Sequence, residues 1–301
     1  MSAEAAPRVS VVIPSHDSAG FAEQAVASAL AQRFGDFEIV VVDDGSGTEA
    51  AAKLEAIARN PRVRLLQQAH RGCRAARRHG WEQARGEYVA FLDDDDRYLE
   101  GYLERCVARL DGDSATGAVY TRYYNVTLSG DRERLLPERG YDGYCFEREV
   151  RKSTIKMSTL MVRRSALLRL RGILEHYTTG GDYDIVLRLS HAHRFAFIDA
   201  PLVAVTKRPG SLSSDLTRRD VNRAEILENL LRVFPQMSAA ERRAVRAKTT
   251  KYYAKAGERA LAAGSTGEAS RIFRQGLATR WSARALRGYL RSSAATLARR
   301  P

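Results

Sequence analysis

Four short apolar runs in the first hundred residues alternate with segments of helical spacing, and this alternation limits the possible folds more than any other feature. The apolar runs are Val9–Ile13, Phe37–Val42, Val63–Gln67 and Tyr88–Leu92. The helical segments between them are Phe21–Gln32, Ala50–Ala58 and Cys73–Ala84. Alternating strands and helices predict a parallel sheet with helices on both faces. Ligands of such sheets bind at the carboxyl ends of the strands.

The rest of the chain is less regular at first and then helical. Between about residues 117 and 205 we expect strands at Ala118–Tyr124 and Phe195–Ile198, and a helix at Tyr183–Ala192. From about Arg218 the pattern is helical throughout. We therefore expect an α/β domain over residues 1–215, followed by a basic α-helical region over residues 216–301.

Composition excludes several classes of protein. The 301 residues are 44% hydrophobic and 28% charged, which is enough apolar residues for a core and is not a disordered profile. The longest aliphatic runs are about five residues, whereas a membrane span needs roughly 20. The N-terminus lacks a signal-peptide pattern. The three cysteines form no CxxC pair, which argues against a disulfide framework or a zinc ribbon. We expect a reduced, cytoplasmic protein.

The formal net charge is +13, and much of it lies near the C-terminus. Eight arginines and no acidic residue occur between Arg271 and Pro301. Four of these recur on one helical face, namely Arg280, Arg284, Arg287 and Arg291. Two interpretations stay open: peripheral contact with an anionic membrane at its inner face, or a solvated face packed on the rest of the protein. Basic and aromatic residues do not interleave, so nucleic acid is not expected as a partner.

Acidic residues follow two of the four predicted strands. Asp93–Asp96 follows one strand directly, and Asp43-Asp44-Gly45-Ser46 follows another. Such a concentration of carboxylates favours a hard divalent cation, Mn²⁺ or Mg²⁺. In an extended chain, Asp93 and Asp95 would face one side and Asp94 and Asp96 the other. The alternative is a solvated N-cap of a helix expected at Tyr98–Leu110.

Six segments resemble the motifs of one family, in order and at the same spacing, over about residues 8–215. They are Val9-Ser-Val-Val-Ile-Pro14; Ile39-Val-Val-Val-Asp-Asp-Gly-Ser46; Gly72-Cys-Arg-Ala-Ala-Arg77 with Gly80; Ala84-Arg-Gly-Glu-Tyr-Val-Ala-Phe-Leu-Asp-Asp-Asp-Asp96; Gly181-Asp182-Tyr-Asp184 with Leu187-Arg-Leu189; and Pro209-Gly-Ser-Leu-Ser213. The sequence is similar to family 2 glycosyltransferases. This resemblance implies a GT-A fold, which is a Rossmann-like, mostly parallel sheet with helices on both faces, here extended by C-terminal helices.

The resemblance also implies a nucleoside-diphosphate sugar as donor, with UDP the most frequent nucleotide of the family. The residues implied for the base and ribose are Pro14, Ser15, His16 and Asp44, with Asp93 or Asp94 also at the ribose. Asp93 and Asp95 match the ends of the DxD motif, and both are candidate metal ligands, Asp95 above all. Arg77 matches an arginine that contacts the nucleotide; by itself it could equally be a solvated helix arginine.

Asp182 matches the carboxylate that acts as general base in inverting members, although a helix N-cap is an alternative reading of this residue. A base is needed because an acceptor hydroxyl is a weak nucleophile until its proton is removed. The growing charge of the leaving diphosphate also needs a metal ion or a cation such as Arg77 nearby.

Some positions depart from the family pattern. Gly181 replaces the acid that usually precedes the base, and Arg208 replaces a common histidine before Pro-Gly-Ser. With arginine at position 208 in place of histidine, a possible metal ligand is missing and a guanidinium can contact the diphosphate instead. His70 stands where asparagine is frequent. The Q-x-x-R-W motif of processive members is absent, so we expect the transfer of a single sugar.

These features predict an inverting transferase that acts in the synthesis of cell-envelope or surface glycans. The acceptor would be a glycan, a lipid-linked sugar or a small molecule. One alternative is a nucleotidyltransferase of related fold, but Pro14–Asp17 lacks the glycine-rich, cationic phosphate loop that it would need. Another is a non-catalytic nucleotide-sugar-binding or scaffold protein, against which the presence of Asp95 and Asp182 argues.

Overall fold

The computed structural model describes residues 6–170, 179–208 and 215–297. The chain forms two compact units. The first, called here the sheet unit, comprises residues 1–146, 154–170 and 186–208. The second, called the helical unit, comprises residues 147–153, 171–185 and 209–301. Helices α5 (Phe146–Arg151) and α7 (Gly181–Ala192) contribute residues to both units.

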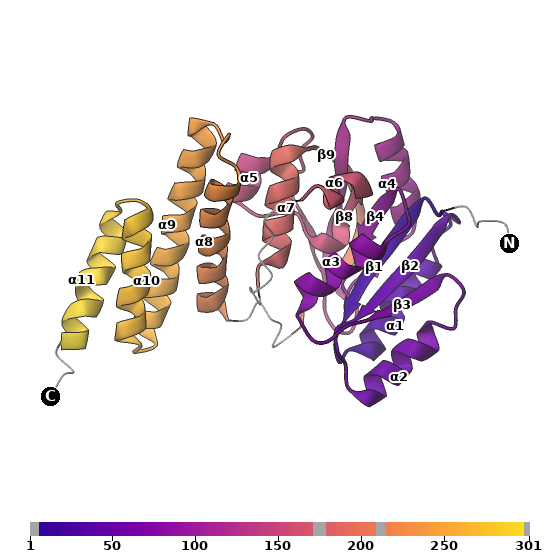
Figure 1. The fold of residues 1–301 in the computed structure, drawn as a ribbon, viewed down its shortest axis with the longest axis horizontal. Coiled ribbons are helices and arrows are strands. Elements are labelled where there is room, and N and C mark those ends of the chain that lie inside the picture. The colour runs from indigo at the N-terminus through magenta and orange to yellow at the C-terminus, as the bar shows by residue number, and fades with distance from the viewer. Residues whose placement is uncertain (1–5, 171–178, 209–214, 298–301) are drawn as a thin grey trace. The chain divides into compact units, whose positions relative to one another are not determined.

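The sheet unit contains the strands and most of the short helices (Figure 1). Its strands are β1 (Val9–Ser15), β2 (Phe37–Asp43), β3 (Val63–Gln67), β4 (Tyr88–Phe91), β5 (Arg97–Tyr98), β6 (Thr116–Val126), β7 (Arg132–Leu136), β8 (Leu160–Arg163) and β9 (Arg194–Thr206). Its helices are α1 (Ala19–Leu30), α2 (Thr48–Ile57), α3 (Cys73–Gln83), α4 (Tyr102–Asp111) and α6 (Arg164–Leu168), with a 3₁₀ turn η1 at Met157–Thr159. The strands and helices predicted before residue 92 are therefore confirmed, with ends shifted by at most a few residues.

The strands form one sheet in the order β3-β2-β1-β4-β8-β6-β9-β5, and β7 pairs with β6. The first four pair in parallel, as the βα alternation predicts. The second half is mixed, because β6 and β9 are parallel while β8, β7 and β5 pair antiparallel with their neighbours. The parallel half brings the carboxyl ends of β1, β2 and β4 to the same edge.

The two faces of the parallel half are covered by different helices. Val11 and Ile13 belong to the same apolar core as the small residues of α1. Val12 lies on the other face, where α3 approaches so closely that a Cβ on Gly80 would come within 2.4 Å of Val12 Cγ1. Gly80 therefore permits α3 to lie directly against the sheet, which sets the position of Arg77 one turn earlier.

Two local predictions need correction. The first strand, expected at Val9–Ile13, continues through Pro14 to Ser15. The pairing of β1 with β4 ends at Val12, so the missing N–H of Pro14 costs no ladder bond on that side. The helix expected at Tyr98 begins at Tyr102, with Gly101 in a left-handed conformation (φ 82°) before it. The aspartate run is therefore not the N-cap of this helix.

Strand β9 is much longer than the predicted Phe195–Ile198. Its pairing with β6 shifts register between Ile198 and Pro201, which indicates a bulge, and then continues to Thr206. The sequence hid this extension because Asp199 and Pro201 look like strand breakers. The extension matters for function, since it brings Thr206 and the residues after it beside the aspartate run.

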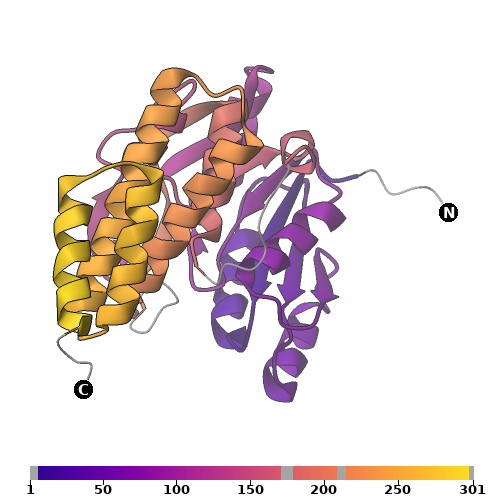
Figure 2. The same ribbon diagram turned by 60° about the vertical axis from the view of Figure 1, so that its left-hand side comes forward.

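The helical unit contains α8 (Leu216–Val233), α9 (Ala239–Ala262), α10 (Thr266–Thr279) and α11 (Ala283–Leu297), each packed against the next (Figure 2). Asp215 caps α8, and a capping box of Ser238 and Glu241 begins α9. Among the described helices, none has both the length and the apolar character required to cross a membrane.

Candidate functional site

A group of polar side chains that we call the strand-end cluster lies at the carboxyl ends of β1, β2 and β4, with Arg77 contributed by α3 and Arg208 by the segment after β9. Its members are His16, Asp44, Arg77, Asp93, Asp94, Asp95 and Arg208. All of them belong to the sheet unit. The parallel pairing of the three strands explains why His16, Asp44 and the aspartates meet at this edge, whereas Arg208 is brought there by β9.

Asp44 is a buried member of the cluster that accepts several hydrogen bonds. Its side chain is only 2% exposed. Oδ1 accepts hydrogen bonds from Gln68 Nε2 (2.7 Å) and the Arg71 backbone N–H (2.9 Å), and Oδ2 accepts one from the Gly72 N–H (2.7 Å). The carboxylate therefore fixes the loop between β3 and α3.

Two histidines lie over this aspartate. The rings of His16 and His70 are stacked, with centroids 4.0 Å apart. Nδ1 of each ring lies within hydrogen-bond distance of the Asp44 carbonyl oxygen, at 2.9 Å for His16 and 3.1 Å for His70. Because a carbonyl oxygen only accepts, both Nδ1 atoms donate, which leaves each Nε2 as the acceptor in the neutral ring. Potential ligand atoms of His16, Asp44 and His70 lie within 4.8 Å of one another.

The four aspartates form a turn rather than an extended segment. The Asp96 N–H donates to the Asp93 carbonyl at 3.0 Å, which closes a turn with Asp94 and Asp95 at its tip. The prediction that Asp93 and Asp95 share one side of an extended chain is therefore wrong. The reason is that β4 ends at Phe91, so the pleat does not continue into the aspartates.

In this turn, Asp93, Asp94 and Asp95 each have a different partner. Asp93 accepts a hydrogen bond from Arg77 Nη2 at 2.5 Å. Asp94 accepts one from the Ser18 hydroxyl. Asp95 forms an ion pair with Arg208, whose Nε lies 2.6 Å from its Oδ2. The structure thus brings both predicted metal ligands, Asp93 and Asp95, and both predicted diphosphate contacts, Arg77 and Arg208, into one cluster.

Burial and neighbouring negative charges change the pKa of Asp94 in this turn. Burial raises the pKa of Asp94 to about 6, and the charges of Asp95 and Asp93 add to the rise; Ser18 and Arg208 oppose it. A carboxyl group with a raised pKa at the carboxyl edge of a sheet is typical of a functional site.

Asp96 has a structural role that the sequence did not reveal. It accepts hydrogen bonds from the Ser158 hydroxyl and from the Thr206 backbone N–H (2.9 Å). Burial, and the charges of Asp93 and Asp95, raise its pKa well above the ordinary value. Ser158 also accepts the Asp93 N–H at 3.1 Å, so it holds the turn at both ends. No sequence signal marks Ser158, which lies in η1, some sixty residues further along the chain.

Other predicted residues are placed as follows. Pro14 lies in β1, and Ser15 beside it is buried with its hydroxyl 3.2 Å from the Ser18 hydroxyl. Asp182 belongs to the helical unit, in the first turn of α7. Because α7 begins at Gly181, Asp182 is the second helical residue and not the N-cap. The Pro209–Ser213 motif lies outside the described residues.

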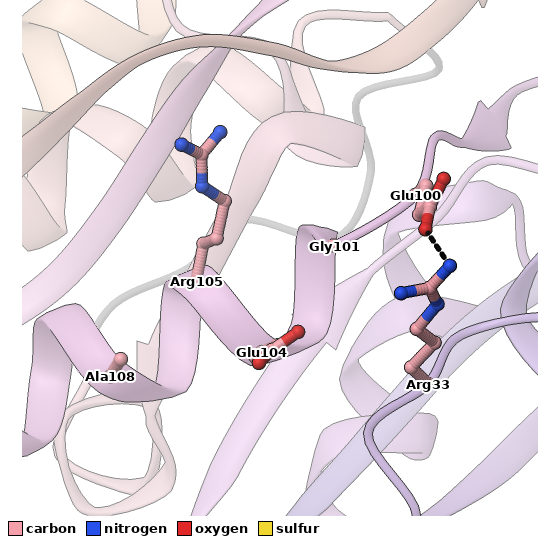
Figure 3. Close-up of a pocket in the computed structure, with 6 residues that line it drawn as sticks. All are labelled: Arg33, Glu100, Gly101, Glu104, Arg105 and Ala108. Atoms are coloured by element: carbon pink, nitrogen blue, oxygen red, sulfur yellow. Dashed lines mark ion pairs between the residues drawn. The ribbon is translucent and has the colours of Figure 1, made fainter.

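A cavity of about 420 Å³ lies elsewhere in the sheet unit, beside α4 (Figure 3). Arg33, Glu100, Gly101, Glu104, Arg105 and Ala108 line it. An ion pair between exposed side chains, Arg33 and Glu100, crosses one side at 2.7 Å. No member of the strand-end cluster lines this cavity, so it is not the candidate functional site.

The sequence model of glycosyl transferase family 2 matches residues 10–171. This match covers more than half of the chain, and the protein belongs to that family. Chondroitin synthase of Escherichia coli is 31% identical over 195 residues, which are 64% of this chain and 28% of that protein. Hyaluronan synthase of Pasteurella multocida is 29% identical over 201 residues, 64% of this chain and 20% of that protein. The chain thus spans roughly a quarter of the length of these relatives.

Solved structures share the fold over nearly the whole chain. TarS 1-349 of S. aureus superposes with a TM-score of 0.67 at 14% identity, over 97% of this chain and 92% of that one. The mannosyltransferase PcManGT of Pyrobaculum calidifontis, solved with GDP-Man and Mn²⁺, gives a TM-score of 0.58 at 18% identity, over 98% and 86%. The expected GT-A fold with a C-terminal helical region is therefore confirmed.

Proposed function

We propose that the protein is a glycosyltransferase that moves one sugar from a nucleoside-diphosphate sugar to an acceptor hydroxyl, with inversion. The observation that carries this proposal is the strand-end cluster, in which Asp44, Arg77 and the aspartate turn meet at one edge of the sheet. The turn supplies oxygen ligands for a cation, and the arginines supply positive charge for a diphosphate.

The nucleotide would bind at the carboxyl ends of β1 and β2. Pro14, Ser15 and His16 would line the base and ribose pocket with Asp44, and Asp93 or Asp94 would reach the ribose. TarS has been solved with UDP and with UDP-GlcNAc, and PcManGT with GDP-Man. We therefore propose UDP as the first nucleotide to test and GDP as the second.

The aspartate turn suits a hard divalent cation. Its donors are carboxylate oxygens, which Mn²⁺ and Mg²⁺ prefer, and burial together with mutual repulsion disfavours leaving them uncompensated. Asp95 would hold the ion, with Asp93 as the second ligand. When bound, the ion would neutralise charge on the leaving diphosphate. Both aspartates are paired with an arginine in this structure, Asp93 with Arg77 and Asp95 with Arg208. Asp95 is preferred because it matches the last aspartate of the DxD motif.

The protein's own residues would carry the remaining steps. Asp182 would accept the proton of the acceptor hydroxyl as its oxygen attacks the anomeric carbon. The bond to the diphosphate breaks in the same displacement, which inverts the anomeric centre. Arg77 and Arg208 would stabilise the departing diphosphate through charge-assisted hydrogen bonds.

We assign catalysis to residues 1–215 and regard residues 216–301 as a basic helical region. The acceptor would be a glycan, a lipid-linked sugar or a small molecule of envelope or surface glycan synthesis, reached from the cytoplasm. Arg284 of α11 is already paired with Glu258 of α9. This pairing reduces the positive charge that α11 offers to an anionic membrane.

Calorimetric titration with UDP, GDP, dTDP and CDP, each with and without Mn²⁺, tests the proposal. One nucleotide should bind in a metal-dependent way, and Asp95→Ala should lose that dependence. Glu104→Ala, an exposed acidic residue beside the distant cavity, is the control and should bind like the wild type. If folded wild-type protein bound none of the four nucleotides, the transferase proposal would be rejected.

A further inference from the structure

Arg208 occupies a position in the strand-end cluster where a cation is needed. Its Nε lies 2.6 Å from Oδ2 of Asp95, and its Nη2 lies 3.7 Å from Oδ1 of Asp94. Its guanidinium carbon lies 4.8 Å from the centre of the Phe21 ring. One side chain therefore faces both carboxylates at the tip of the turn and rests on an aromatic face.

The two carboxylates at the tip are poorly solvated. The Asp94 side chain is 13% exposed and that of Asp95 is 18% exposed. Carboxylates buried next to each other strongly disfavour full ionisation unless a positive charge is close. Arg77 is engaged with Asp93, so Arg208 is the cation that the described part of the cluster offers to the other two.

The main chain around Arg208 is anchored, whereas its side-chain contact is not a well-aligned hydrogen bond. The Thr206 N–H donates to Asp96, and the Lys207 N–H donates to the Val126 carbonyl at 3.0 Å. Arg208 Nε is buried close to Asp95, yet it forms no aligned hydrogen bond. This combination allows the guanidinium to leave the turn by side-chain rotation while β9 stays in place.

We propose that Arg208 is a built-in counter-cation of the aspartate turn, which a divalent metal ion must displace from Asp95 in order to bind. The proposal rests on the proposed function, because that function places the metal at Asp95. It makes Arg208 a determinant of metal affinity in this chain. The displaced guanidinium is then free to contact the diphosphate.

Direct metal binding tests this competition without any sugar transfer. Free Mn²⁺ is measured by electron paramagnetic resonance in titrations of the wild type, Arg208→Gln and Arg208→Lys. Arg33→Gln removes the same charge from an exposed pair in the same unit and serves as control. We expect Arg208→Gln to bind Mn²⁺ about fivefold to tenfold more tightly, the size of one partly buried ion pair. Arg208→Lys keeps the charge and should stay near the wild type, as should Arg33→Gln.

Thermal unfolding gives an independent readout. Without metal, Arg208→Gln should melt at a lower temperature than the wild type, because it leaves two carboxylates uncompensated. Saturating Mn²⁺ should raise its melting temperature more than that of the wild type, since the metal replaces the missing cation. If Arg208→Gln does not fold, the less disruptive Arg208→Lys still tests the proposal, because any change in its affinity beyond that of Arg33→Gln contradicts it.

The outcomes separate this inference from the proposed function. Equal or weaker Mn²⁺ binding by Arg208→Gln, or no binding by either protein, would overturn the competition. A UDP and GDP titration of the same samples decides the nucleotide-binding role separately. Nucleotide binding with an unchanged metal affinity would leave the transferase proposal standing and reject only the role of Arg208.

Discussion

The two units of this protein use charged residues in opposite ways. In the sheet unit, four consecutive aspartates are folded into one turn and held by Arg77 and Arg208. In the helical unit, Asp220 is buried and paired with Arg259, but no comparable run of like charges is folded together in its described residues, and other charges form exposed pairs such as Arg284 with Glu258. Like charges concentrated in a partly buried turn lower the stability of the fold. Such an arrangement is typical of a functional site, where a bound ligand stabilises it. Ion pairs spread over a solvated surface change the stability of the fold only slightly.

The largest effect is expected at the one functional residue assigned to the helical unit. Asp182→Asn should lower the rate of sugar transfer by about 10²- to 10⁴-fold, because the amide cannot accept the acceptor's proton. Nucleotide affinity should be unchanged, since the strand-end cluster is untouched. The rate is followed as release of the nucleoside diphosphate from the donor that the nucleotide titration identifies. Turnover equal to the wild type would remove Asp182 from the mechanism.

The next effect is on the packing of the helical unit. Phe273 is fully buried, and Cβ atoms on Gly257 and Gly288 would lie 2.8 and 2.3 Å from its ring. Phe273→Ala should therefore destabilise the helical unit by about 3–5 kcal/mol. Leu290→Ala, an exposed site on α11, should change stability by less than about 0.5 kcal/mol. Urea unfolding followed by circular dichroism measures both, and equal effects would contradict the packing that we describe.

A smaller effect is expected where α3 meets the sheet. Gly80→Ala would place a methyl group against Val12 and Val42, and should destabilise the sheet unit by about 1–3 kcal/mol. Gly20→Ala is the matched control, because no heavy atom beyond its chain neighbours and the nearby backbone of α1 lies within 4 Å of its Cβ position. This control should gain up to about 1 kcal/mol from helix propensity. Chemical denaturation compares the two, and a neutral Gly80→Ala would show that the contact relaxes without cost.

The smallest effect depends on pH. Burial, with the charges of Lys251 and Arg223, lowers the pKa of Lys248 to about 8. A cation whose pKa is lowered by folding destabilises the protein below the folded pKa, and this penalty disappears as pH rises from about 8 toward the unfolded value. After discounting for partial solvent exposure, Lys248→Met should gain less than about 1 kcal/mol at pH 7 and nothing at pH 10.5.

Melting curves at both pH values test this prediction. Lys152→Met, an exposed site in the same unit, is the control and should show no such pH dependence. A gain for Lys248→Met that persisted at high pH would point to apolar packing instead of charge removal.

The parts of the site that local pattern encodes were predictable from the sequence. The apolar runs located the first four strands, and the carboxyl-end rule placed Asp44 at the same edge of the sheet as the aspartate run, with β1 between their two strands. Contacts that depend on distant segments were not predictable. Ser158 and Thr206 hold the aspartate turn from η1 and β9, and neither carries a local signal. The prediction that Asp93–Asp96 is an extended segment was wrong for the same reason, because the contacts with Ser158 and Thr206 hold this segment in a turn.

The helical unit shows the converse limit. Its helical character was predictable from periodicity. Gly264, which has a left-handed φ of 79°, lies in the turn between α9 and α10. The pairing of Arg284 with Glu258 was not predictable from the sequence. Helical spacing shows that the arginines share one face, but it does not show which other helix packs against that face. Sequence motifs thus identify where chemistry is concentrated, while the partners of spread charges depend on tertiary packing.

Hydrogen exchange with and without nucleotide and Mn²⁺ tests the central claim most directly, namely that the nucleotide and the metal ion bind at the strand-end cluster. Binding of UDP, or of whichever nucleotide the titration selects, should slow exchange at residues 14–18, 43–46, 68–72 and 92–96. Exchange in α9, α10 and α11 should stay unchanged. Protection confined to those three helices, or none at the four strand-end segments despite measurable binding, would contradict the account.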